Sequence, residues 1–396
     1  MSKLLRPGLR LTHRERFLRQ MHFQTIDRGV HWEFGYWGQT IERWHNEGLP
    51  RGINKGEGRG SVEAFFGVDP TFVVPIDVGL EPPFSGPVEV IEEKERSRIV
   101  KHPDGMIAEE GKGDVVSIPR YIKMPIAGRE DWKRFKERLD PHSPGRARDW
   151  AAIGELTRSA TVPVGVYFGS FFGWIRDWVG FEQLALMMYD DPDLVEEMVE
   201  TLTQVKLVQL EACLTECQVD FAFGWEDICF RGGPMISPAM FKDIVAPRVK
   251  QVCDLLRQHG VDIIWTDCDG DIRPLVPIWL EAGLNCMFPL EVHCGSDPVE
   301  LRKEYGKRIL LRGGIEKYRL SKTREDILAE LKRVEKVFEE GGYIPHCDHR
   351  VPPDVPYDNY CYYIREKLAM MGWTKEDVSE VWGIRLWNSD GQAEAH

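Results

Sequence analysis

The sequence lacks the features of several large classes of protein. No apolar run is long enough to cross a bilayer, and charges interrupt residues 1–21, where a secretory signal would place its apolar stretch. The nine cysteines are an odd number and include no C-x-x-C pair, so neither a disulfide framework nor a zinc finger is expected. We therefore expect a cytoplasmic protein with reduced cysteines and no membrane partner.

Basic residues are also in short supply. The chain has 51 lysines and arginines against 64 aspartates and glutamates, which gives a formal net charge of -13. Binding to a nucleic-acid backbone needs a positively charged surface. DNA and RNA are therefore not expected as partners. Apolar material, in contrast, is plentiful, because 42% of the 396 residues are hydrophobic, which is enough for two domains or one large barrel.

The apolar residues occur in short runs, most of them followed by a helical pattern. Eight runs have the character of strands: GVHWEF, TFVVPID, PVGVYFG, VDFAFGWED, DIIWTDCDG, LNCMFPLEV, ILLRGG and GGYIPHCDH. Amphipathic helical patterns follow the third, fourth and seventh runs, over residues 191–214, 237–260 and 321–342. Strands and helices that alternate in eightfold count predict an α/β protein with a (β/α)8, or TIM, barrel.

Two segments lie outside this alternation. A capping box from Thr12 to Glu15 predicts a helix in an N-terminal extension, residues 1–28, which we expect to plug one end of the barrel. Residues 88–125 alternate with a period of two around Asp104-Gly105, which predicts an antiparallel β-hairpin inserted at the mouth. The barrel is expected to be a single domain over residues 29–383, followed by a tail at 384–396.

The residues that close the strands are the candidate site, because TIM barrels place active sites at the C-terminal ends of their strands. They are Trp32, Glu33, Tyr167, Glu226, Asp227, Asp267, Cys268, Asp269, Glu291, Arg312 and His346 to His349. Residues two apart in a strand face the same way, so Asp267 and Asp269 can share a direction while Cys268 faces the other. The predicted substrate contacts are Trp32, Glu33, Tyr167 and Arg312.

The carboxylates of this set have two interpretations. Glu226, Asp267 and Asp269, joined by a thiolate, would make a zinc site with mixed oxygen and sulfur ligands and an open position for substrate. Alternatively, carboxylates at strand ends hydrogen-bond backbone amides where the loops begin. Arg312 is equally open, since a guanidinium suits a substrate carboxylate and also a structural ion pair with a neighbouring acid.

The segment GGYIPHCDHRVPPDV, residues 341–355, places four potential ligands in a row. We predict that Cys347 is the thiolate metal ligand and that Asp348 or His349 orients the site, while the prolines that follow end the strand. The predicted catalytic residues are Asp269, Asp348 and His349. For each histidine alone, the alternative is that it caps a loop carbonyl.

The order of these motifs resembles the uroporphyrinogen decarboxylase superfamily, which unites that haem-pathway enzyme with zinc-dependent methyltransferases that work with corrinoid proteins. The resemblance covers about Thr12 to Gly383 and rests on LTHRERFLRQMHFQTIDR, SPAMFKDIVAPRVKQV, LRGGI and GGYIPHCDHRVPPDV. It implies a TIM barrel, and dimerisation is what the superfamily suggests.

Two departures from the superfamily bear on the reaction. The decarboxylases carry a MRQAGRY-type segment whose arginines hold substrate carboxylates, whereas residues 31–44 here contain no arginine before Arg43. The methyltransferases take zinc ligands from an H-x-C-G pattern and a later C-D. Here the first pattern becomes Asp267-Cys268-Asp269-Gly270, and Cys347-Asp348 matches the second. The resemblance therefore implies an oxygen-richer metal site.

These considerations leave three hypotheses. The leading one is a methyltransferase subunit that uses zinc and exchanges a methyl group with a corrinoid on a separate protein. The second is a metal-free decarboxylase of a tetrapyrrole or another polycarboxylate, in which Asp269 or Asp267 steadies a cationic intermediate. The third is a non-catalytic binder that holds a flat or cationic ligand on the aromatic residues of the mouth.

Overall fold

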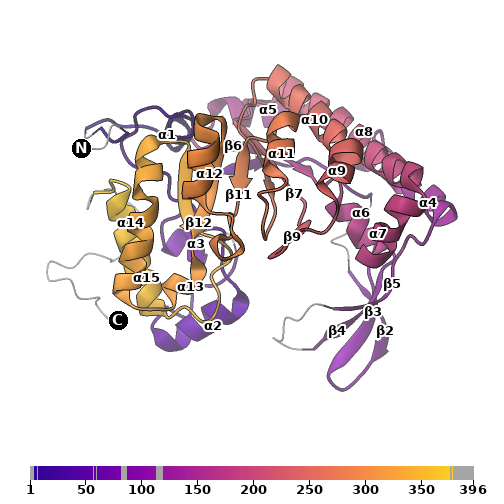
Figure 1. Ribbon diagram of the computed structural model, residues 1–396, viewed down its shortest axis with the longest axis horizontal. Helices are drawn as coiled ribbons and strands as arrows, with labels where there is room; N and C mark the ends of the chain where they lie inside the picture. Colours follow the sequence, from indigo (N-terminus) through magenta and orange to yellow (C-terminus); the bar gives the residue numbers. More distant parts are fainter. Residues whose placement is uncertain are drawn as a thin grey trace.

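The computed structural model describes residues 4–6, 8–56, 58, 60–81, 87–112, 119–374 and 377. At its centre lie parallel strands in the order β1-β6-β7-β10-β11-β12-β13. Their bounds are β1 (Phe72–Val74), β6 (Val164–Gly169), β7 (Phe221–Trp225), β10 (Ile264–Asp267), β11 (Cys286–Phe288), β12 (Leu310–Ile315) and β13 (Tyr343–Cys347). Helices flank the strands (Figure 1), which confirms the predicted α/β class and a TIM-barrel-like fold.

The first predicted strand, residues 29–34, is corrected by the structure, because this segment is not assigned to any strand. It still lies between β13 and β1. The His31 carbonyl accepts the Asp69 N–H at 2.8 Å, and the Gly35 carbonyl accepts the Val351 N–H at 2.9 Å. The Asp69 carboxylate accepts the His31 N–H at 2.9 Å, in place of the backbone carbonyl that a neighbouring strand would supply. The segment therefore fills the eighth position of the barrel without being a strand.

The predicted helices after the third, fourth and seventh runs are present. They are α8 (Pro192–Glu216), α10 (Ala246–Gln258) and α14 (Arg324–Glu340). The other outer helices are α5 (Trp150–Ser159), α11 (Val276–Ala282), α12 (Pro298–Tyr305) and α15 (Tyr357–Met370). Within the described ranges, no helix combines the length and the apolar character that crossing a bilayer requires.

The strands bury both of their faces. Val166, Leu311 and Tyr343 belong to the large apolar cluster between strands and helices, whereas Phe221 and Trp265 belong to a smaller cluster inside the barrel. Side chains along a strand alternate between these two clusters because successive residues point to opposite faces. The inner cluster is the one that supports the candidate site.

Helix α1 (His13–Met21) closes one end of the barrel, as predicted from its capping box. The Thr12 side chain accepts the Glu15 N–H, and the Glu15 carboxylate accepts the Thr12 N–H at 2.8 Å. Phe17 and Met21 are fully buried in the inner cluster. The Gln20 carbonyl accepts the Gly342 N–H at 2.7 Å, which places α1 at the N-terminal end of β13 and so opposite the mouth.

The antiparallel insertion is larger than the predicted hairpin. It is a four-stranded sheet of β2 (Glu89–Glu93), β3 (Ser97–Lys101), β4 (Ile107–Gly111) and β5 (Arg120–Lys123). Gly105 makes the predicted turn between β3 and β4 with a φ of +100°, a conformation that glycine adopts without strain. Figure 1 shows the sheet projecting below α6 (Gly173–Val179) and α7 (Phe181–Asp190), on the lower side of the view, where α13 (Lys317–Leu320), which follows β12, also lies.

Candidate active site

A cavity of about 440 Å³ opens inside the barrel near the C-terminal ends of the strands. Eight of its 16 lining residues are aromatic: Trp32, Phe34, Tyr167, Phe221, Phe223, Trp225, Trp265 and Phe288. Phe34, Tyr167, Phe223 and Trp225 are partly exposed, and the other four are buried. The cavity therefore has a buried aromatic floor and a partly exposed aromatic rim.

Strand alternation builds this cavity. Trp265 and Asp267 both face inward from β10, and their register partners on β7 are Phe223 and Trp225. Trp265 stacks on Phe221 with ring centroids 4.7 Å apart and an angle of 16° between the planes. The carboxylate of Asp267 thus emerges from an aromatic wall at the last residue of its strand.

Arg312 lies against the floor of the cavity and makes no ion pair among the described residues, although the charge of Asp267 in the same cavity attracts it. Its Cζ atom is 4.7 Å from the ring centroid of Trp32, 4.4 Å from that of Trp265 and 4.6 Å from that of Phe288. Its Nε atom is buried without a hydrogen-bond partner among the described residues. Burial lowers the pKa of Arg312 to about 10, so the guanidinium stays charged at neutral pH.

Three carboxylates gather beside this cavity. Asp227, Asp267 and Asp269 each offer an oxygen, and these oxygens lie within 4.8 Å of one another. One oxygen of Asp267 and one of Asp269 are buried without a hydrogen-bond partner. Burial and the charge of Asp269 raise the pKa of Asp227 to about 6, and burial with both neighbouring aspartates raises that of Asp267 well above its usual range. We call these three residues the aspartate group.

His349 is attached to the aspartate group. Its Nε2 atom lies 3.2 Å from an oxygen of Asp269, and this hydrogen bond raises the pKa of the imidazole although burial opposes it. The ring stacks on Trp37 with centroids 5.9 Å apart and meets the edge of Phe34 at 5.4 Å. Two of the predicted catalytic residues, Asp269 and His349, are therefore in direct contact.

Comparison with known proteins supports the resemblance found in the sequence. The sequence model of uroporphyrinogen decarboxylase (URO-D) matches residues 110–366, which is more than half of the chain. The chain belongs to the URO-D family. This matched region contains Arg312, His349 and the whole aspartate group.

Two known proteins extend this comparison. A uroporphyrinogen decarboxylase from Neisseria meningitidis is 24% identical over 181 residues, which are 43% of this chain and 47% of that protein. The chain thus spans about half the length of this curated relative. A methyltransferase from Methanosarcina mazei has a similar structure, with a TM-score of 0.55, 13% identity and coverage of 91% of this chain and 98% of that one. At that identity the similarity establishes the fold alone.

Glu226 is separated from the aspartate group, although the sequence prediction joined them. Its carboxylate accepts the N–H groups of Phe171, Phe172 and Gly173 at 2.8, 2.9 and 3.0 Å, and the Ser170 hydroxyl at 3.1 Å. These donors are the three residues before α6 and its first residue, Gly173. The alternative interpretation, a carboxylate that holds loop amides, therefore describes Glu226.

Asp227 takes the place that the sequence prediction gave to Glu226. Phe221, Phe223 and Trp225 all line the cavity, so counting on by two reaches Asp227. The residue adopts a φ of +45°, a left-handed conformation that aspartate tolerates better than most residues, and Arg176 donates to its carbonyl. Alternation along β7 was the signal that could have identified it.

Cys347 faces away from the cavity, which corrects its predicted role beside Asp269. Cys347 belongs to the cluster between strands and helices, whereas Ile344 belongs to the inner cluster. The ring centroid of His346 lies 5.6 Å from that of the cavity residue Phe288. Alternation along β13 therefore turns Cys347 outward. Among the described residues, the group able to hold a metal contains three aspartates and no cysteine.

Glu33 also turns its carboxylate outward. That carboxylate pairs with Lys367 of α15, and both side chains are fully buried. It also accepts the Tyr363 hydroxyl at 3.0 Å and the Cys347 N–H at 3.3 Å. Glu33 borders the cavity, but its side chain is occupied in fixing residues 29–34 against α15. Trp32, Tyr167 and Arg312, the other predicted substrate contacts, do line the cavity.

Asp348 connects two loops at the mouth. One oxygen of its buried carboxylate accepts the Val292 N–H at 3.1 Å, and the other accepts the Lys317 N–H at 3.0 Å. These residues follow β11 and β12 respectively. The carboxylate thus holds the loops around the site, and burial raises its pKa to about 7.

The raised pKa of Asp348 predicts a pH-dependent contribution to stability. The folded state holds the proton more tightly than the unfolded chain, so this contribution is complete below about pH 4 and is lost as pH rises through about 7. We expect the difference in free energy of unfolding between wild type and Asp348→Asn to be larger at pH 5 than at pH 8. Urea unfolding at both values measures it, and an equal difference would contradict the prediction.

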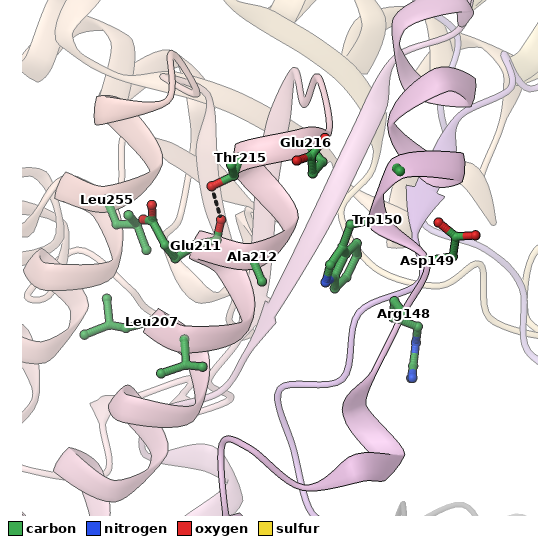
Figure 2. A pocket seen from close by; sticks show the side chains of 11 residues that line it. Arg148, Asp149, Trp150, Leu207, Glu211, Ala212, Thr215, Glu216 and Leu255 are labelled. Carbon is green, nitrogen blue, oxygen red and sulfur yellow. Dashed lines mark hydrogen bonds between the residues drawn. The ribbon is translucent and has the colours of Figure 1, made fainter.

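A second hollow lies on the outside of the barrel. This groove, of about 870 Å³, runs between the start of α5 and the C-terminal half of α8, with Leu255 of α10 at its edge. Figure 2 shows Trp150 on one wall and Leu207, Ala212 and Leu255 on the other. Its lining residues come from outer helices and from none of the strand ends, where this fold places catalysis. The inner cavity is therefore the candidate active site.

Proposed function

We propose that this chain is a methyltransferase subunit that moves a methyl group between a small methylated substrate and a corrinoid carried by a separate protein. A divalent cation at the aspartate group is part of the proposal. The observation that carries it is the presence of three carboxylates within 4.8 Å, with two buried and unpartnered oxygens, beside a cavity for a small molecule.

A divalent cation fits these residues for electrostatic reasons. Burial is the main cause of the raised pKa values of Asp227 and Asp267, and repulsion among the three carboxylates raises them further. A cation removes that repulsion and supplies partners for the free oxygens. Zinc, which the family resemblance implies, accepts carboxylate oxygens, and an all-oxygen donor set also suits harder cations such as Mn²⁺ and Mg²⁺. When bound, the cation supplies a Lewis acid to the heteroatom that carries the methyl group.

The protein residues have separable tasks in this proposal. The aromatic floor and rim exclude water from the substrate, and Arg312 fixes its orientation. The heteroatom needs a proton after the methyl group has gone. His349, held at Nε2 by Asp269 and by its stacking on Trp37, would provide that proton from Nδ1, the ring nitrogen that Asp269 does not occupy, or accept it in the reverse direction.

Decarboxylation of a polycarboxylate is the alternative, and the charge of the cavity counts against it. Each substrate carboxylate would need a cation, yet Arg312 is the one cation among the described residues that line the cavity. Arg28, which lies nearby, is already committed to Asp69 through two hydrogen bonds of 2.9 Å. A substrate with one anionic group matches this arrangement better than one with several.

The proposal is tested by methyl transfer to chemically reduced free cobalamin, which stands in for the corrinoid protein. Cation-loaded enzyme would be mixed with methanol, trimethylamine, dimethyl sulfide or 4-methoxybenzoate, and methylcobalamin formation followed by absorbance. We expect formation with at least one donor, and its loss when EDTA removes the cation. Formation of carbon dioxide from uroporphyrinogen by EDTA-treated enzyme, with no methyl transfer from any donor, would overturn the proposal.

A further inference from the structure

We infer that the cavity is a binding site for a flat aromatic monocarboxylate, with the carboxylate on Arg312, the ring between the aromatic walls and a polar substituent toward the aspartate group. The identity of that substituent as a methylated heteroatom rests on the proposed function. Binding of the aromatic acid itself does not rest on it.

Arg312 is a buried cation that makes no ion pair among the described residues. A buried cation without an anion or an acceptor costs free energy, so natural proteins usually pair it. Here Arg312 is only 8% exposed, its guanidinium is surrounded by three aromatic rings, and it makes no ion pair in the described ranges, although the charge of Asp267 attracts it from the same cavity. The carboxylate of a ligand would complete the site, because a guanidinium accepts a carboxylate through two parallel hydrogen bonds.

The distribution of charge around the cavity favours a monocarboxylate. Two of the lining acids are already neutralised, Asp69 by Arg28 and Glu33 by Lys367. Asp267 is the lining acid that makes no ion pair among the described residues, and it belongs to the aspartate group. Among its described lining residues, the cavity thus has one positive charge outside any ion pair, on Arg312, and one acid outside any ion pair, Asp267. A purely cationic ligand would be repelled by Arg312, whereas a ligand with an anionic end and a cation-binding end matches both.

The walls of the cavity also suit a flat aromatic ligand in shape and chemistry. Phe34, Tyr167, Phe223 and Trp225 expose part of their rings at the rim, and Trp265 forms a flat stack with Phe221 below. Ring faces and edges interact best with another planar ring in offset or edge-to-face geometry. A volume of about 440 Å³ is at the small end for ligand sites and suits one substituted ring.

Calorimetric titration of the EDTA-treated protein tests this inference without any need for turnover. The probes are benzoate, 4-methoxybenzoate, cyclohexanecarboxylate, anisole and benzyltrimethylammonium. We expect both benzoates to bind, and we expect cyclohexanecarboxylate, anisole and the ammonium compound to bind at least about tenfold more weakly. Equal affinity for benzoate and anisole, or stronger binding of the ammonium compound, would overturn the inference.

Variants locate the carboxylate. Arg312→Gln is expected to weaken benzoate binding by about 10- to 100-fold, without a fall in Tm, because the change removes an unpaired buried charge. Arg350→Gln is the matched control, since Arg350 is an exposed arginine whose Cζ atom lies 5.6 Å from the ring centroid of Trp37 at the mouth. A large loss of affinity in the Arg350 variant, with none in the Arg312 variant, would overturn the assignment.

Aromatic-acid binding and methyl transfer can succeed or fail independently of each other. Benzoate binding that needs Arg312, in a protein that never transfers methyl groups, would leave the binding site standing and remove the methyltransferase proposal. Methyl transfer from methanol or trimethylamine, in a protein that binds no aromatic acid, would do the opposite.

Discussion

Lys367→Met is expected to lower the free energy of unfolding by about 3–5 kcal/mol, because it leaves the Glu33 carboxylate buried without its cation. Both side chains of this pair are fully buried. The remaining partners of Glu33, the Tyr363 hydroxyl and the Cys347 N–H, are neutral donors and cannot replace the positive charge. Urea or guanidinium unfolding measures the change.

Two further variants separate the ion pair from simple loss of a side chain. Glu33→Gln combined with Lys367→Met removes both charges and should recover much of the stability lost in the single variant. Lys336→Met, an exposed lysine of α14, should change the free energy of unfolding by less than about 0.5 kcal/mol. If the single variant Lys367→Met lost no more than this control, the importance of the buried pair would be refuted.

Asp227→Asn, Asp267→Asn and Asp269→Asn are each expected to lower kcat/KM for methyl transfer by at least about 100-fold. Asparagine keeps the shape of each side chain but removes the charge that the cation needs. The Asp227 variant is the most informative of the three, because the structure places this residue, and not Glu226, in the aspartate group. The measurement is the initial rate of methylcobalamin formation at saturating cation.

Cys268→Ala is the matched control for these variants. Cys268 lies between Asp267 and Asp269 in the chain, but it is buried in the cluster between strands and helices and so faces away from the cavity. Its rate should remain within about twofold of wild type, since it touches neither cation nor substrate. Full activity in Asp227→Asn, or loss in Cys268→Ala, would contradict the geometry of the aspartate group.

Much of the fold follows from local sequence signals. The capping box at Thr12, the helical patterns and the turn at Asp104-Gly105 each act over a few residues, and the structure contains all of them. The irregular eighth segment could not be predicted in the same way. Its course depends on Asp69 and Lys367, which lie far along the chain from residues 29–34, and no local pattern reports such contacts.

The direction of individual side chains was harder to predict than the strands themselves. In a closed parallel barrel both faces of a strand are buried, so YIPHC in β13 is fully buried and gives no alternation from which to assign the face of Cys347. In β7, every second residue from Phe221 faces the cavity, and continuing this alternation beyond Trp225 reaches Asp227. The prediction that Asp267 and Asp269 share a direction agrees with the nearness of their carboxylate oxygens, although β10 ends at Asp267.

Metal content after reconstitution with Zn²⁺, Mn²⁺ or Mg²⁺ and removal of free ions tests the central claim most directly. Wild type and Cys347→Ala are each expected to retain about one divalent cation per chain, and Asp227→Asn and Asp269→Asn to retain less than about a tenth of that amount. Absence of any retained cation in wild type would contradict the claim. So would loss of the cation in Cys347→Ala together with its retention in Asp227→Asn.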